Sequence, residues 1–174
     1  MELGLLILRV VVGLLFMGHG AQKLFGMFGG YGIEGTGGFF ESLGLKPGRF
    51  HAFNAGAAEF AGGALLALGL LTPLAAALLI GTMTVAIATV HWSKGVWSSE
   101  GGYEYNLVLI AAVFALAATG PGKWSLDNAF SIDANGTAWA LAALGAGLIG
   151  GVVTLGFGRM QAARAGSGSP TTAT

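Results

Sequence analysis

The chain alternates between five long apolar segments and short polar connections. The apolar segments cover residues 3–25, 52–71, 73–92, 105–119 and 137–157. A helix needs about 20 mostly apolar residues to cross the hydrocarbon core of a bilayer. Four segments reach this length, and the segment 105–119 reaches it only with its polar start near Gly102. The pattern therefore predicts five membrane-spanning helices.

The connections predict how these helices follow one another. Thr72 and Pro73 leave almost no loop between the second and third segments, which predicts a tight antiparallel hairpin with Pro at a helix start. The longest connection, 26–51, contains a stretch that either forms a short interfacial helix or stays an ordinary loop. In the helical case Thr36 would cap its start and Gly44 would end it in a left-handed conformation. Its apolar side chains would then lie in the headgroup layer: Phe39, Phe40 and Leu43.

The expected fold is thus an all-α membrane protein. We expect an antiparallel four-helix transmembrane bundle over residues 1–130 and a fifth, C-terminal transmembrane helix within residues 131–160. The remaining residues, 161–174, are rich in Gly, Ser, Thr and Pro toward their end and are expected to form a disordered tail.

Composition supports the membrane assignment and excludes several functions. The chain is 54% hydrophobic and 9% charged, whereas a soluble domain carries roughly 25% charged residues. Its 32 glycines suit closely packed membrane helices. Eight basic and eight acidic residues leave no excess charge for binding nucleic acid. Because the chain has no Cys, redox chemistry requires a non-covalent cofactor, a diffusible quinone or the thiols of a partner.

Ionisable residues interrupt four of the apolar segments or stand at their ends. A charge at the bilayer centre costs about 2.5–3.5 kcal/mol, so such residues face the interior of a bundle. At about 100° per residue, each lies on a stripe of mostly small residues. These stripes are Arg9–Gly13–Phe16–Gly20–Lys23 with His19 at its edge, Ala55–Glu59–Gly63–Ala67, Gly81–Thr84–Ala88–His91, and Glu104–Val108–Ala111–Ala115–Ala118. We expect the four stripes to bring Arg9, His19, Glu59, His91 and Glu104 together.

The fifth segment and the histidines have simpler interpretations. Ala143, Gly147 and Gly151 form a small-residue face without an ionisable group, which predicts a packing helix. Arg9 and Glu59 would serve equally well as a structural ion pair or as functional residues. His91, beside Trp92, fits an interfacial anchor as well as a ligand, and His19 fits a hydrogen-bonded bundle histidine.

Several kinds of chemistry remain open at this point. Two histidines on two helices would suit a b-type haem, and His with Glu would suit a metal site, but two histidines alone assign neither group. No metal ligand is therefore assigned. A quinone pocket is easier to satisfy, because it needs an apolar slot, hydrogen-bond donors and a proton donor. His, Glu, Tyr and Trp side chains at the helix ends supply these groups.

Four stretches of the chain form an ordered set of motifs. They are Arg9–Gly26 (RVVVGLLFMGHGAQKLFG), Glu59–Ala75, His91 followed by Gly101–Tyr105 (GGYEY), and Gly120–Asp127 (GPGKWSLD). In order and spacing they resemble the DoxX family of small bacterial membrane proteins. The resemblance implies a four-helix bundle in the bacterial inner (plasma) membrane, and kinship with the quinone-reducing membrane subunit of thiosulfate:quinone oxidoreductase. Pro73, where the family often has a basic residue, and the fifth helix depart from the family pattern.

The resemblance also assigns polar positions to a site. They are Glu59, His91 and Glu104 as catalytic residues, and Arg9, His19, Lys23 and Tyr105 as residues that bind the substrate or the quinone. The last motif ends at Asp127, where the sequence Ser-Leu-Asp would also simply cap a short helix.

Three functions follow from these observations. The first is a redox-linked subunit that passes electrons from a sulfur compound or a partner protein to a non-covalently bound quinone. The second is a non-catalytic anchor or assembly subunit of a larger respiratory or oxidative-stress complex, and the third is a small transporter. Besides lipid, we expect other membrane or redox subunits as partners. Positive charges favour an outside N-terminus and an inside C-terminus, because one side would hold Lys23, Lys46, Arg49, Lys94, Arg159 and Arg164.

Overall fold

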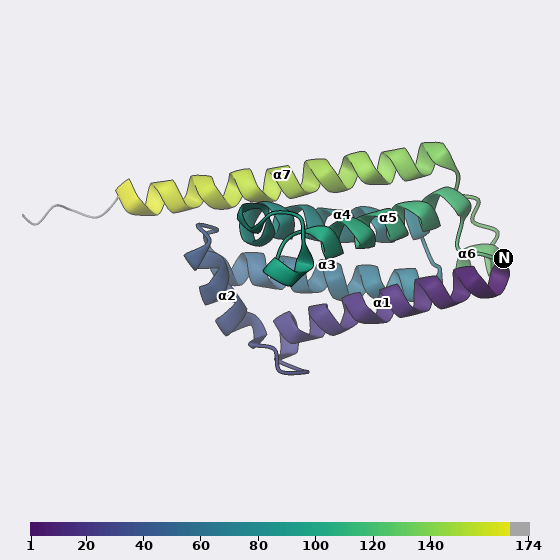
Figure 1. The fold of residues 1–174 in the computed structure, drawn as a ribbon, viewed down its shortest axis with the longest axis horizontal. Coiled ribbons are helices and arrows are strands. Elements are labelled where there is room, and N and C mark those ends of the chain that lie inside the picture. The colour runs from purple at the N-terminus through teal and green to yellow at the C-terminus, as the bar shows by residue number, and fades with distance from the viewer. Residues whose placement is uncertain (168–174) are drawn as a thin grey trace, which may run out of the picture.

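The computed structural model describes residues 1–167, and every regular element within them is helical. The five longer helices run lengthwise through the molecule (Figure 1): α1 (Glu2–Phe25), α3 (Gly48–Leu68), α4 (Thr72–Ala86), α5 (Glu104–Thr119) and α7 (Thr137–Ser167). The short helix α2 (Gly32–Ser42) packs at the end of the molecule where α1 ends and α3 begins. The shortest helix, α6 (Leu126–Ala129), lies at the opposite end, near the N-terminus. The prediction of an all-helical fold is confirmed.

Three helical stretches are long and apolar enough to cross a membrane. They are Glu2–Phe25, Thr72–Lys94 and Thr137–Ser167. The apolar helix α5 has 16 residues and is shorter than a membrane span requires. The 21 residues of α3 include His51, Asn54 and Glu59, which lower its hydropathy. The complete arrangement of four spans plus one therefore stays a prediction.

Glycines bring α1 and α3 into direct backbone contact. A Cβ atom at Gly13 would lie 2.6 Å from the carbonyl oxygen of Gly63, and a Cβ atom at Gly63 would lie 2.5 Å from that of Gly13. A second contact joins Gly20 to Gly56, whose carbonyl oxygen would lie 2.7 Å from a Cβ atom at Gly20. Any side chain at these points would push the two helices apart. The predicted small-residue stripe of α1 is thus confirmed as a packing surface.

The glycine face of α7 packs against α4. A Cβ atom at Gly147 would lie 2.7 Å from the Cβ atom of Ile80, and one at Gly151 would lie 2.8 Å from that of Thr84. The prediction that this helix packs through its small residues is confirmed. Beside this contact, large buried side chains of α3, α4 and α5 form the main hydrophobic core, including Leu66, Leu79, Ile80, Val113 and Leu116.

The predicted inward stripe of α5 is wrong. Val108 is 60% exposed, and Ala111 and Ala115 are also exposed. The buried face instead carries Asn106, Leu109, Val113, Leu116 and Ala117. In the predicted stripe Gly81–Thr84–Ala88–His91, Ala88 is likewise exposed. Spacing alone misassigned these faces because lipid is as apolar as the core, so apolar periodicity does not distinguish the two environments.

The connection between α1 and α3 contains the predicted short helix, with one changed boundary. This helix, α2, starts at Gly32, so Thr36 lies inside it and does not cap it. Gly44 has a φ of 77°, as the predicted left-handed turn requires. Phe40 is buried with Leu45, Ala52 and Leu155, which contradicts its predicted place in the headgroup layer, whereas Phe39 is exposed.

The predicted disordered tail is partly helical. Helix α7 continues to Ser167, so residues 161–167 are helical. Gln161, Ala162, Ala163 and Arg164 are good helix formers, which the composition of the whole tail concealed. Residues 168–174 of the predicted tail lie outside the described residues.

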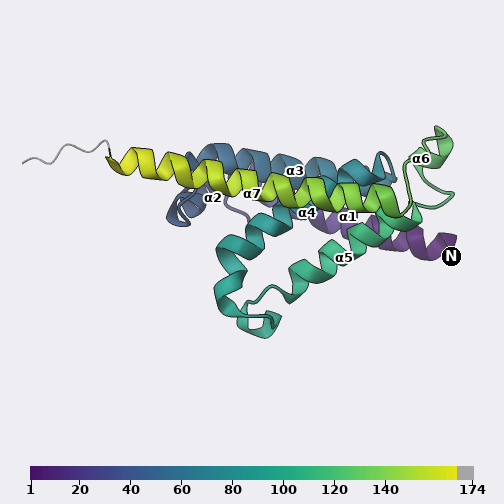
Figure 2. The ribbon, with the colours of Figure 1, turned by 90° about the horizontal axis from the view of Figure 1, so that it is seen from above.

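The end of α4 departs from regular α-helical geometry. After Ala86 the chain forms a π-helical turn, η1 (Ile87–His91), and a 3₁₀ turn, η2 (Trp92–Lys94). Figure 2 shows this end of the helix bending away from α3 and α7 before the chain returns along α5. A π-turn inside a helix is rare and frequently marks a functional site.

Candidate functional site

A cavity of about 730 Å³ lies in the half of the molecule where α4 bends away. Residues of α1, α3, α4, α5 and α7 line it, together with residues of α2 and of the loop before α5. Most of the lining is apolar. All three histidines of the chain belong to it: His19, His51 and His91. The volume lies in the range of ordinary ligand-binding pockets.

Lys23 and Glu59 form an ion pair on the wall of this cavity. The Nζ atom of Lys23 lies 2.5 Å from Oε2 of Glu59, and Glu59 is only 4% exposed. Gly56, one turn before Glu59, makes the pair possible, since a Cβ atom there would lie 3.1 Å from the Cβ atom of Lys23. The second carboxylate oxygen of Glu59 has no hydrogen-bond partner within residues 1–167, yet it is not sealed from the cavity.

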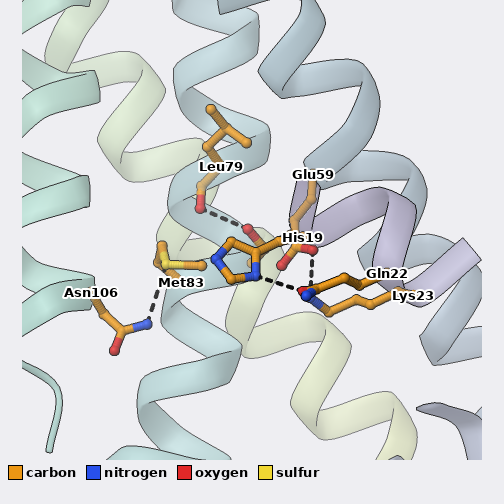
Figure 3. Close-up of polar contacts among 8 residues, drawn as sticks. His19, Gln22, Lys23, Glu59, Leu79, Met83 and Asn106 are labelled. Atoms are coloured by element: carbon orange, nitrogen blue, oxygen red, sulfur yellow. Dashed lines mark hydrogen bonds and ion pairs between the residues drawn. The ribbon is translucent and has the colours of Figure 1, made fainter. Parts of the chain in front are cut away.

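His19 lies on the same wall, one turn before Lys23. Its Nδ1 atom is 3.1 Å from Oε1 of Gln22, and Gln22 in turn donates to the carbonyl oxygen of Phe28. Because Gln22 uses its amide nitrogen for Phe28, its oxygen accepts from His19. This leaves Nε2 of a neutral His19 ring as an acceptor. Figure 3 shows His19, Lys23 and Glu59 gathered in one place.

His91 stands on the opposite side, at the end of the π-turn. Its Nδ1 atom lies 2.6 Å from the carbonyl oxygen of Gly101 in the loop before α5. A carbonyl oxygen only accepts, so Nδ1 carries the hydrogen and Nε2 of the neutral ring remains an acceptor. Tyr105 also lines the cavity and is about half exposed.

Glu104 stabilises the loop before α5 and does not line the cavity. Its Oε2 atom accepts hydrogen bonds from the backbone N–H of Ser98 at 3.0 Å and from the Ser98 hydroxyl at 2.8 Å. These two bonds favour the charged carboxylate of Glu104. Ser98 itself borders the cavity, so Glu104 shapes the rim indirectly.

Arg9 lies far from the other predicted site residues. It is 2% exposed, and its guanidinium donates to the carbonyl oxygens of Ala67, at 2.6 Å, and of Trp124. The fourteen residue steps from Arg9 to Lys23 span about 21 Å of helix. The predicted pairing of Arg9 with Glu59 is therefore wrong. Helices α1 and α3 pack antiparallel through their glycines, and in this register Arg9 lies beside the end of α3. Lys23 therefore forms the ion pair with Glu59.

Asp127 has a structural role that the sequence did not reveal. Its buried carboxylate accepts from the backbone N–H groups of Leu71, at 2.7 Å, and Thr72, at 3.1 Å, and from the Thr72 hydroxyl at 2.7 Å. It therefore caps the N-terminus of α4, although it follows Thr72 by 55 residues in the sequence. Ser125 caps α6 through the N–H of Asn128, as the simpler interpretation of that motif expected. The tight hairpin at Thr72 and Pro73 is confirmed.

The sequence missed two polar residues of the cavity, His51 and Asn106. His51 hydrogen-bonds to the carbonyl oxygen of Lys46 at 3.3 Å, and Asn106 donates from Nδ2 to the sulfur of Met83 at 3.2 Å. Asn106 interrupts the apolar segment 105–119, and that interruption was the available signal. Within residues 1–167, no three His, Asp or Glu side chains are close enough to share a metal ion.

A model of the DoxX family matches residues 4–92, which is half of the chain. The chain belongs to the DoxX family. The matched DoxX region includes the first two motifs and His91, whereas the stretches 101–105 and 120–127 lie beyond it.

Two relatives agree with the DoxX assignment. The chain is 36% identical over 126 residues to a Bacillus subtilis protein named "Putative oxidoreductase CatD", covering 72% of this chain and 86% of that protein. It is 31% identical over 134 residues to "Uncharacterized membrane protein Rv3486" of Mycobacterium tuberculosis, covering 71% and 79%. No solved structure was found to match. This DoxX protein is therefore a membrane protein in contact with lipid.

Proposed function

We propose that this DoxX protein is a redox-linked integral membrane subunit that passes electrons from a sulfur compound or a partner protein to a quinone. The observation that carries the proposal is the apolar cavity with the Lys23–Glu59 pair on its wall. Such a cavity suits a lipid-soluble ligand with a polar head. The printed name of the Bacillus subtilis relative supports an oxidoreductase.

The proposed reaction balances with thiols as the electron donor. Two thiols form one disulfide and release two electrons and two protons. A quinone that takes up these two electrons and two protons becomes a quinol. Since the chain has no Cys, the thiols belong to a small molecule or to a partner protein.

In this proposal, some cavity residues stabilise charge or transfer protons, and others bind the quinone ring. Lys23 stabilises negative charge on one quinone oxygen as electrons arrive, and Glu59 passes one of the two protons to that oxygen through its unbonded carboxylate oxygen. The other proton goes to the second quinone oxygen. His19 binds the ring from the same wall as the ion pair, and His91 and Tyr105 bind it from the other walls. Glu104 is a positioning residue, because it holds the loop that carries the Gly101 partner of His91.

We further propose that α1, α3, α4, α5 and α7 all span the bacterial inner membrane. The α2–α3 connection and the ends of α4 and α7 lie toward one end of the molecule (Figure 1). These segments carry most of the basic residues: Lys46, Arg49, Lys94, Arg159 and Arg164. This asymmetry supports a cytoplasmic C-terminus and an external N-terminus.

The deciding experiment is a quinone-reduction assay on the purified protein in mild detergent. Decylubiquinone is the acceptor, and thiosulfate or dithiothreitol is the donor. We expect reduction by the wild-type protein and a loss of at least tenfold in Glu59→Gln. The control Glu34→Gln removes a carboxylate from an exposed ion pair with Arg49 and should keep full activity. Absence of quinone reduction by the wild-type protein, alone and with its native partners, would overturn the proposal.

The glycine face of α7 does not support a purely structural assembly role. Such a role would need this face as a free surface for another subunit. Gly147 and Gly151 instead pack inside the chain against Ile80 and Thr84. An assembly role for this face would require α7 to leave α4.

A further inference from the structure

Asn106 is a buried amide whose hydrogen-bonding capacity is mostly unused. It lies on α5, lines the cavity and is 4% exposed. Within residues 1–167, Nδ2 has one acceptor and Oδ1 has no partner. Oδ1 is nevertheless not sealed from solvent, and it therefore borders the open cavity. A primary amide has two donor hydrogens and a carbonyl oxygen.

The single contact of this amide is also a weak one. Nδ2 donates to the thioether sulfur of Met83, at 3.2 Å, and a thioether is a poor acceptor. Leaving polar groups underused in an apolar interior is unfavourable, because a desolvated donor or acceptor has lost its hydrogen bond to water without replacing it. A ligand that offered an oxygen atom would recover this free energy, because the amide would exchange a weak partner for a strong one.

Asn106 faces the cavity from the side opposite the ion pair. Glu59 belongs to α3 and Asn106 to α5, and both helices pack against α4. Figure 3 shows Asn106 beside Met83 on one side and the Lys23–Glu59 pair on the other, with His19 in view between them. The cavity thus has polar groups on two sides, and apolar side chains such as Leu78 and Leu109 also line it.

We propose that Asn106 binds the second ring oxygen of a ligand whose first oxygen lies at Lys23 and Glu59. The ligand class is a ring with two oxygens in opposite positions, as in a 1,4-quinone or its quinol. The amide suits both redox forms, because Nδ2 donates to a quinone carbonyl and Oδ1 accepts from a quinol hydroxyl. This inference rests on the proposed quinone-binding function and adds a residue that fixes the orientation of the ring.

The test compares two ligands that differ by one hydroxyl. A decyl-substituted 1,4-hydroquinone and the decylphenol that lacks one hydroxyl are titrated, without oxygen, into the full-length protein in detergent. Isothermal titration calorimetry gives each dissociation constant. We expect wild-type protein to bind the hydroquinone about tenfold more tightly, the effect of one hydrogen bond. In Asn106→Leu the two ligands should bind equally well.

Two further variants separate binding from folding. Val113→Ala removes a buried side chain from the same face of α5 without touching the cavity, and it should keep the tenfold preference. Asn106→Ala serves if the Leu variant does not fold, and it should also lose the preference. A structural role for Asn106 would weaken both ligands by the same factor and leave their ratio unchanged.

The outcomes distinguish this inference from the proposed function. If the wild-type protein and Asn106→Leu share the same tenfold preference, the assignment of Asn106 is overturned and quinone binding stands. If the wild-type protein binds both ligands equally, the contact with a second oxygen is overturned. If it binds neither the hydroquinone nor decylubiquinone, both the inference and the proposed function fail.

Discussion

Lys23 and Glu59 meet at 2.5 Å between α1 and α3, although the sequence also offered Arg9 as a partner for Glu59. Both residues border the cavity, and Glu59 is almost fully buried. Removing one member of a buried pair leaves the other charge without compensation, which is strongly destabilising in an apolar surrounding. The pair therefore links the fold of the bundle to the chemistry proposed for the cavity.

The first prediction concerns this pair. Lys23→Met should lower both the thermal stability and the rate of quinone reduction, because it leaves Glu59 buried without a cation. The double variant Lys23→Met/Glu59→Gln should recover stability but not activity, since it removes both charges. Thermal unfolding and the decylubiquinone assay measure the two effects. Recovery of activity in the double variant would show that neither charge takes part in the reaction.

The second prediction concerns the contact between α1 and α3. Gly13→Ala should destabilise the protein, because its Cβ atom would lie 2.6 Å from the carbonyl oxygen of Gly63. Gly18→Ala on the same helix has open space around it and should be neutral or stabilise the helix by up to about 1 kcal/mol. Thermal unfolding in one detergent compares the two. Equal stability of these variants would contradict the close approach of the helices.

The third prediction concerns the packing of α7. Gly147→Leu should separate α7 from α4 and lower the melting temperature, because its Cβ atom would lie 2.7 Å from that of Ile80. Gly145→Leu places the same side chain on the same helix where nothing lies within 4 Å, and should leave the melting temperature nearly unchanged. A lower melting temperature for Gly145→Leu than for Gly147→Leu would show that the other face of α7 packs against the bundle.

The fourth prediction concerns the cap of α4. Asp127→Ala removes the acceptor of three hydrogen bonds from Leu71 and Thr72 and should cost about 2–4 kcal/mol of stability. Asp133→Ala, a few residues later and outside this cap, is the control and should have little effect. Because Asp127 is distant from the cavity, the Ala variant that remains folded should still bind quinone.

The fifth prediction concerns the loop held by Glu104. The Glu104 carboxylate accepts hydrogen bonds from the backbone N–H and the hydroxyl of Ser98, and these two bonds hold the loop in place. At pH 7, hydrogen exchange in residues 95–104 should be faster in Glu104→Gln than in the wild-type protein. Equal exchange rates in the two proteins would contradict the assigned contact.

The sequence by itself determined the helices and the membrane environment. Apolar length predicted the helical segments, and small residues spaced three or four apart predicted the packing faces of α1 and α7. Low charge and the absence of Cys restricted redox chemistry to diffusible or partner-borne groups. These properties are local, because they follow from helix periodicity and from the cost of burying charge.

Only the tertiary structure decided which residues meet. The contacts of Gly13 with Gly63 and of Gly20 with Gly56 fix the register of α1 against α3. In this register Lys23 forms the ion pair with Glu59, and Arg9 lies at the other end of α3. The inward face of α5, with Asn106 on it, was equally inaccessible to the sequence. The physical reason is that lipid and protein core are both apolar, so periodicity shows that a helix has faces but not which face another helix covers.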